Sequence, residues 1–86
     1  MTEITGELKF PIVGHHRLII RAEALDLEST RALFENFDLV EPLQQAHVSA
    51  GGKYVSLALS VRLQDRAEMN RLDEQIKLVP GLKMVL

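Results

Sequence analysis

Strict alternation of apolar and polar or small side chains over residues 54–63 constrains this sequence more than any other feature. Valine and leucine occupy every second position of that segment. Successive side chains of a β-strand point to opposite faces, so the pattern predicts a strand with one face buried and the other exposed to water. Gly51-Gly52, directly before it, favours a tight turn because glycine adopts positive φ angles without steric cost. The alternating segment 43–50 then predicts the other strand of a hairpin.

Two helices and two further strands complete the pattern. The predicted elements are strands over residues 15–23, 43–50, 54–63 and 82–86, one helix over residues 27–37, and a second helix between Asp65 and Pro80. Asp26 and Asp65 are suited to the N-cap position, where a carboxylate accepts hydrogen bonds from free backbone N–H groups. Pro80-Gly81 ends the second helix, so the order of elements is β-α-β-β-α-β.

This order predicts an α+β fold of the ferredoxin-like type. Each helix has one apolar stripe and each strand one apolar face, so the simplest packing places both helices on one face of a four-stranded antiparallel sheet. Right-handed crossovers give the strand order 4-1-3-2. We expect a single domain over residues 15–86, preceded by a loosely ordered tail over residues 1–14.

The composition of the 86-residue chain excludes several classes of protein. The sequence has no cysteine, which excludes disulfides, thiolate metal sites and thiol catalysis. No apolar run approaches the ~20 residues of a membrane-spanning helix. The net charge of −2 argues against nucleic-acid binding. The first residues show neither the basic nor the apolar region of a secretory signal, so we expect a cytoplasmic protein.

The sheet face turned away from the helices is predicted to be basic. Four cations and only Glu23 as a carboxylate give this face a formal charge of +3, on a chain of net charge −2. Such a face is suited to a small anionic ligand or an acidic protein partner. The other interpretation is that these are the polar residues that any water-exposed sheet face requires. The candidate binding residues are Arg17, Arg21, Tyr54, Ser56, Arg62 and Lys83.

Apolar residues on the same predicted face indicate a second kind of function. Ile19, Ala58 and Val85 are expected to be neighbours there, which suits a protein partner or a second copy of the chain. The alternative function is therefore a structural interaction module that forms a homodimer through the sheet.

Metal binding and catalysis find little support in the sequence. His15 and His16 point to opposite faces of one strand, and a strand separates His15 from His47 by at least ~9–10 Å. Zinc ligands lie ~2 Å from the ion, so we expect no metal and no cofactor. No G-x-S-x-G motif occurs and no pair of carboxylates falls on the open face, so we expect no enzymatic activity.

RNA binding is a remote alternative. The open face of such a sheet binds RNA by stacking bases on aromatic side chains of the central strands. Tyr54 is the one aromatic residue predicted at such a position.

The C-terminal part of the sequence resembles a known family. The run G-K-Y-V-S-L-A-L-S-V-R-L from Gly52, the capped helix after it and the ending Met84-Val85-Leu86 are similar to the YbeD-like family of small uncharacterised bacterial proteins, and Phe10-Pro11 fits the start of that family. The resemblance implies a fold similar to the ACT regulatory domains, which bind small molecules and commonly pair, and it implies no catalytic residues. It also implies a regulatory link to an enzyme of the lipoate pathway.

Overall fold

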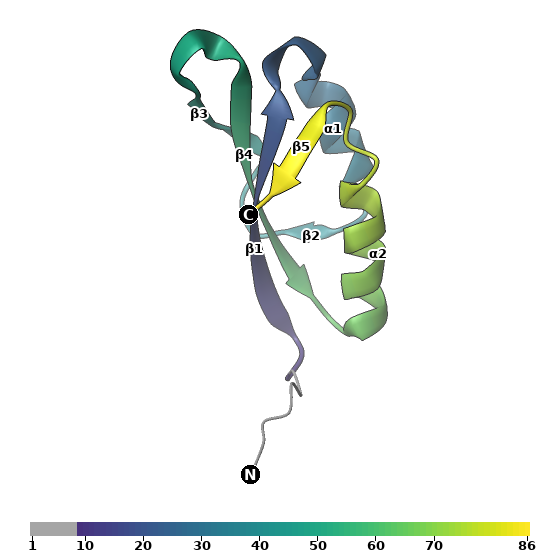
Figure 1. Cartoon of the computed structure of the whole chain (residues 1–86). Coiled ribbons are helices and arrows are strands. Elements are labelled where there is room, and N and C mark those ends of the chain that lie inside the picture. Colours follow the sequence, from purple (N-terminus) through teal and green to yellow (C-terminus); the bar gives the residue numbers. More distant parts are fainter. Residues whose placement is uncertain (1–8) are drawn as a thin grey trace.

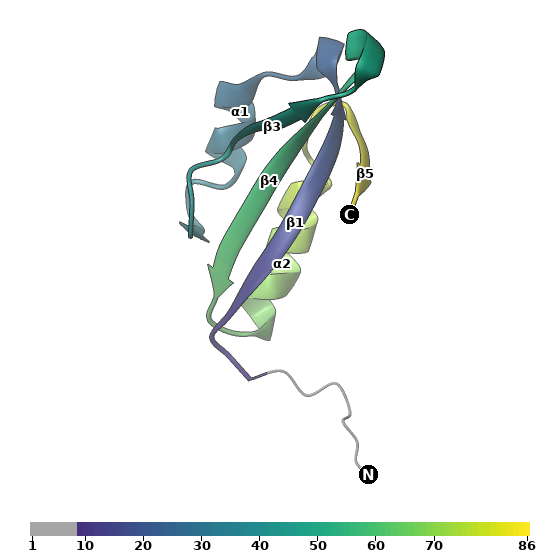
Figure 2. The same ribbon diagram turned by 90° about the vertical axis from the view of Figure 1, so that its left-hand side faces the viewer.

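In the computed structural model, which describes residues 9–86, an antiparallel sheet of five strands carries two α-helices on one face (Figures 1 and 2). The strands are β1 (Ile12–Arg21), β2 (Asp38–Leu39), β3 (Gln44–Val48), β4 (Tyr54–Leu63) and β5 (Leu82–Val85). The two long strands, β1 and β4, pair along all ten residues in the middle of the sheet. β5 pairs with the other edge of β1, while β2 and β3 pair with opposite halves of β4.

Both helices begin where the sequence predicts. Asp26 caps α1 (Leu27–Leu33) by accepting hydrogen bonds from the Glu28 and Ser29 N–H groups, and Asp65 caps α2 (Arg66–Ile76) by accepting one from the Glu68 N–H. Both end earlier than the apolar stripes predict. At the end of α1, the Phe34 N–H bonds to the carbonyl three residues back, which closes the helix with a tight turn.

The core lies between the helices and one face of the sheet. The alternation in β4 is confirmed, because its valine and leucine side chains are all at most 5% exposed. Leu18 and Ile20 of β1 complete the sheet side of the core, and Phe34, Leu72 and Ile76 pack onto it from the helical layer. Complete burial of one such side chain contributes roughly 1.5–3 kcal/mol, so this layer holds the helices on the sheet.

The α+β class, the two helices and the antiparallel sheet are confirmed, but the sheet has five strands instead of the predicted four. β2 has two residues, too few for an alternating pattern, and it pairs with Val61 and Arg62 of β4. β1 begins at Ile12, so residues 12–14 belong to the sheet and not to a tail. Residues 1–8 of the predicted tail lie outside the described residues.

A β-bulge in β5 reverses the predicted facing of its last residues. Met84 lies opposite Ile19 and Leu82 opposite Ile20, so Lys83 is an additional residue. Val85 therefore lies opposite the core residue Leu18 and shares its face. The prediction that Val85 belongs to the open face is wrong, because one inserted residue moves the next side chain to the other face.

A similar irregularity interrupts β3. Gln44 pairs with Ala58 and Gln45 with Leu57, but His47 pairs with Ser56, so one additional residue lies between the two pairs. Gln44 and His47 therefore share the open face, whereas Gln45 lies opposite the core residue Leu57.

Candidate functional site

The six candidate binding residues extend along the whole open face and do not meet at one point. Tyr54 and Arg62 occupy opposite ends of β4, eight residues apart, which corresponds to roughly 26 Å of strand. A small ligand cannot contact both. In the structure, Arg21, Tyr54 and Lys83 lie at one end of the sheet, which we call the basic end. Arg17 and Ser56 lie near the middle of the face, and Arg62 forms an ion pair at the far end.

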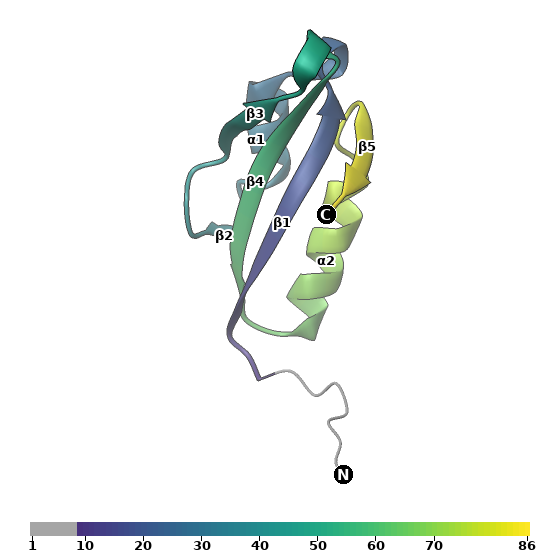
Figure 3. The same ribbon diagram turned by 60° about the vertical axis from the view of Figure 1, so that its left-hand side comes forward.

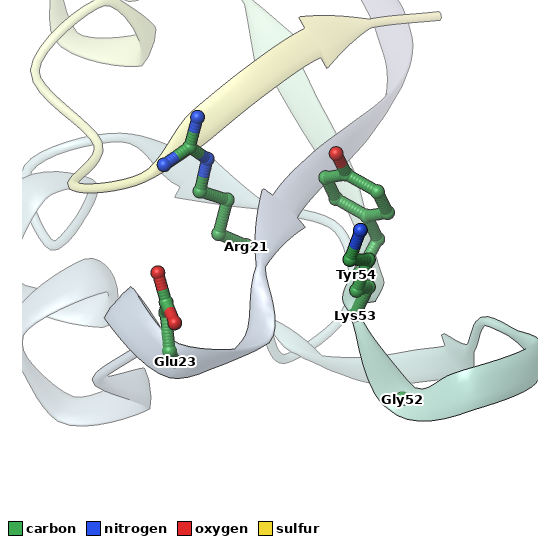
Figure 4. Close-up of a pocket in the computed structure, with 5 residues that line it drawn as sticks. All are labelled: Arg21, Glu23, Gly52, Lys53 and Tyr54. Atoms are coloured by element: carbon green, nitrogen blue, oxygen red, sulfur yellow. The ribbon is translucent and has the colours of Figure 1, made fainter.

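The basic end lies where β1 finishes and β4 starts. Arg21 and Tyr54 are directly opposite each other in the ladder and project to the same side of the sheet (Figure 4). Together with Glu23, Gly52 and Lys53 they line a depression of about 350 Å³. An adjoining depression of about 490 Å³ shares Arg21 and Glu23 and is also lined by two further cations, Lys77 and Lys83.

The turn before β4 positions these residues. Gly51 and Gly52 have φ angles of 87° and 73°, which only glycine adopts without strain. Ser49 closes the turn through two hydrogen bonds with Tyr54. The Ser49 Oγ accepts a hydrogen bond from the Tyr54 N–H at 2.9 Å, and the Ser49 N–H donates one to the Tyr54 carbonyl at 2.8 Å. The Ala22 N–H donates to the Lys53 carbonyl at 2.9 Å, which ties this turn to the end of β1.

Charge at the basic end is strongly one-sided. The two depressions are lined by four cationic side chains and one carboxylate, on a chain of net charge −2. Lys77 forms an exposed ion pair with Glu74 at 3.4 Å, so its charge is partly compensated. The remaining cations, Arg21, Lys53 and Lys83, concentrate positive potential at this end, which attracts anions.

Lys53 and Lys77 are absent from the candidates that the sequence indicates. Lys53 lies in the turn, with φ −77° and ψ −34°, so strand alternation does not predict its direction. Lys77 follows the end of α2, in a different layer from the strands. The signal that points to Lys53 is its place between Gly52 and Tyr54, directly after a tight turn at the sheet end.

Arg62 and Ser56 are poorly placed to bind the same ligand. Arg62 forms an ion pair with Asp38 of β2 at 3.2 Å, at the far end of the face. Ser56 lies between Ile19 of β1 and His47 of β3 and is only 8% exposed, so it offers a ligand little surface.

Arg17 lies in the middle of the face. It lines a separate depression of about 400 Å³ together with His15, His16, Ala58, Ser60 and Leu86. The apolar part of the open face therefore contains Ile19 and Ala58, as predicted, with Met84 opposite Ile19 in the place expected for Val85. Met84 is 46% and Leu86 66% exposed.

One side-chain contact on this face has the residue types of a catalytic pair. His15 Nδ1 and Ser60 Oγ are hydrogen-bonded at 2.9 Å because the two residues are directly opposite in the ladder. A serine nucleophile needs its histidine oriented by a third group, usually a carboxylate. Within residues 9–86, no histidine forms an ion pair with a carboxylate, and no three metal-ligating side chains gather. The contact is a cross-strand hydrogen bond.

Comparison with known proteins matches a family and a solved structure. A family model described as "Protein of unknown function (DUF493)" matches residues 7–86. No curated protein matches. The solution structure of protein HP0495 from H. pylori is similar to this chain, with a TM-score of 0.74 and 17% sequence identity, and the alignment covers 100% of this chain and 94% of that one. At this identity the similarity supports a shared fold.

Among the described residues, no helix has the length and apolar character needed to cross a membrane.

Proposed function

This chain belongs to the YbeD-like (DUF493) family of proteins of unknown function, and we propose that it is a small binding module without enzymatic activity. Its ligand is an anionic group, a carboxylate or a phosphate, received at the basic end of the open sheet face. Arg21 and Lys53 supply the charge, and Tyr54 supplies a flat surface and a hydroxyl group.

The observation that carries this proposal is the meeting of Arg21, Lys53 and Tyr54 around one depression of about 350 Å³. A volume of this size is suited to a small molecule or to one acidic side chain of a protein. Glu23, the one carboxylate at the rim, leaves a positive excess once Lys83 from the adjoining depression is included. A chain with net charge −2 otherwise repels anions, so this end is where one binds most favourably.

The proposal includes a regulatory role in the cytoplasm and a ferredoxin-like fold that resembles ACT domains. The spatial order β5-β1-β4-β3 supports this fold, since it corresponds to the order 4-1-3-2 expected of it. The family resemblance implies an enzyme of the lipoate pathway as the partner, and the basic end would bind it through an acidic side chain of that enzyme.

A titration with two anions tests the proposal. Backbone amide NMR spectra of the labelled full chain are recorded with increasing lipoate, and separately with a phosphate ester, glycerol 3-phosphate. We expect saturable shifts at Arg21, Lys53 and Tyr54 with one of them. Arg21→Gln should weaken this binding at least tenfold, because it removes a charge partner from the site. The matched control is Arg62→Gln, which removes a cation of the same face outside the depression and should leave binding unchanged.

Two results would count against the proposal. One is a set of spectra that neither anion changes. The other is equal weakening by the Arg21 and Arg62 variants, which would indicate only unspecific attraction to a charged face.

A homodimer is the second candidate function, favoured by the exposed apolar residues at the end of β5. Met84 and Leu86 are both exposed, and Met84 continues the apolar surface that Ile19 and Ala58 begin. Equilibrium sedimentation tests it: a dimer that Met84→Lys dissociates would support this function, and a monomer at millimolar concentration would exclude it.

A further inference from the structure

β5 covers only part of the edge of β1. On one side, β1 pairs with β4 along its full length. On the other side, β5 and the residue after it pair with Arg17 to Ile20. No strand within residues 9–86 pairs with the segment 12–16 on that side. Figure 3 shows this half of β1 at the border of the sheet, and Figure 2 shows α2 behind the strand.

Backbone groups along this segment are directed outward. Arg17 and Leu86 exchange two backbone hydrogen bonds, of 3.0 and 2.8 Å, and the Arg21 N–H donates to the Gly81 carbonyl on the same side of β1. In an antiparallel ladder every second residue directs its N–H and C=O groups to the same neighbour. Val13 and His15 therefore direct theirs to the uncovered edge, which is a template for another strand.

Depressions flank this edge on both faces of the sheet. On the open face lies the depression of about 400 Å³ that includes Arg17 and His15. On the helix side lies one of about 360 Å³, lined by His16, Asp73, Ile76, Lys77, Leu82 and Val85. Because the side chains of a strand alternate between faces, a strand added here directs one set into each depression.

The two depressions differ in chemistry. The one on the open face contains Arg17 and His15 and no acidic side chain among its lining residues, so it favours an acidic side chain of a partner. The one on the helix side is lined by the apolar residues Ile76, Leu82 and Val85 together with His16, Asp73 and Lys77. Its three apolar residues favour an apolar side chain. Val13, also next to the edge, lies opposite Arg62 on the open face and is 39% exposed.

We infer that the edge of β1 over residues 12–16 binds an extended segment of a partner protein, which adds to the sheet as a further strand. The side chains of that segment alternate between acidic and apolar. This site is separate from the basic end, because Arg21 and Tyr54 lie at the opposite end of β1 and contribute nothing to it.

The experiment uses a synthetic peptide, acetyl-TEVEVET-amide, and the labelled full chain. We expect peptide binding to shift the amides of residues 12–17 and to slow hydrogen exchange at Val13 and His15, because these N–H groups gain acceptors. A peptide of the same composition with its glutamates and valines grouped should bind at least tenfold more weakly, since it cannot satisfy both depressions.

Three variants locate the contacts. Val13→Pro removes an outward N–H while β4 pairs with the residues on either side, and should weaken binding at least tenfold. Arg17→Glu tests the same contact even if the proline variant fails to fold. This variant should lose affinity for the glutamate peptide and gain affinity for a peptide in which lysines replace the glutamates. Arg21→Glu, on the same strand and face but outside the edge, should leave peptide affinity unchanged, which keeps this test independent of the proposed anion site.

Several outcomes would overturn the inference. Shifts centred on Arg21 and Tyr54 would mean that the peptide binds only as an anion at the basic end. Equal affinity for the two peptide orders would exclude strand addition. Slow exchange of Val13 and His15 before any peptide is added would mean that the chain itself, or a second copy, already covers this edge.

Discussion

Replacing Gly81 with alanine should destabilise the protein much more than the same change at Gly51, although both glycines have positive φ angles, 77° and 87°. A left-handed conformation costs an L-residue roughly 1–2 kcal/mol, and the lower entropy of the unfolded chain offsets about 0.4–1 kcal/mol of this. These contributions are common to both positions. A Cβ at Gly51 meets nothing within 4 Å, whereas a Cβ at Gly81 lies 2.6 Å from the Ala24 Cβ.

The overlap at Gly81 sets the size of the difference. Overpacking of this kind typically costs about 1–3 kcal/mol. We therefore expect Gly51→Ala to lower the free energy of unfolding by roughly 1 kcal/mol and Gly81→Ala by roughly 2–4 kcal/mol. The Gly81 carbonyl accepts the Arg21 N–H, so the second variant should also shift the Arg21 amide resonance.

Urea denaturation followed by circular dichroism measures both changes. The decisive control is Ala24→Gly, alone and combined with Gly81→Ala, because it removes the methyl group that the new Cβ would meet. In that background the Gly81 change should cost about as much as Gly51→Ala does. Equal losses for the two single glycine variants, or no recovery in the double variant, would refute the close packing of Gly81 against Ala24.

Three further predictions concern the core, a helix cap and a surface ion pair. Leu57→Ala should lower the free energy of unfolding by about 2–5 kcal/mol, because Leu57 is fully buried; a loss below 1 kcal/mol in urea denaturation would contradict the core assignment. Hydrogen bonds from the Ser29 side chain and N–H lower the pKa of Asp26 below its ordinary value of 3.8, so the stability that this carboxylate adds is present above pH 3.8 and is lost as the pH falls through the lower folded-state pKa. Asp26→Ala should flatten that part of the stability profile, measured as urea midpoints between pH 2 and 6, and an unchanged profile would exclude the cap. Arg62→Ala should cost less than ~1 kcal/mol at low salt and less still at 1 M NaCl, since the pair with Asp38 is exposed; a salt-independent loss above 2 kcal/mol would contradict this.

The fold was largely predictable because its central elements follow simple periods. The alternation of residues 54–63 predicts β4 without error, and Asp26 and Asp65 mark the starts of both helices. The sequence does not predict β2, because a strand of two residues is too short to show an alternation of apolar and polar side chains. β4 and the two helices depend on local conformational preferences and on the burial of one face, and both leave a direct pattern in the sequence.

The candidate site was predictable only in part. Arg21 and Tyr54 share the open face as predicted, because both belong to regular strands paired in register. The alternation of residues 82–86 predicts the wrong face for Val85, because a bulge depends on how β5 pairs with β1 and no feature of these residues indicates an additional residue. The sequence does not indicate the ion pair of Arg62, because its partner, Asp38, lies in the two-residue strand that the pattern does not predict.

The pairing of β1 with β4 also bears on how the chain folds. The two strands are 33 residues apart along the chain at Arg21 and Tyr54, and 51 residues apart at Ile12 and Leu63. Closing the 33-residue loop costs about 0.4 kcal/mol less in chain entropy than closing the 51-residue loop. We therefore expect the pairing of β1 with β4 to form first at the basic end and then to extend toward Ile12. Arg21 and Tyr54 at the basic end would then be among the first residues to come into contact. Substitutions there would slow folding as well as alter binding.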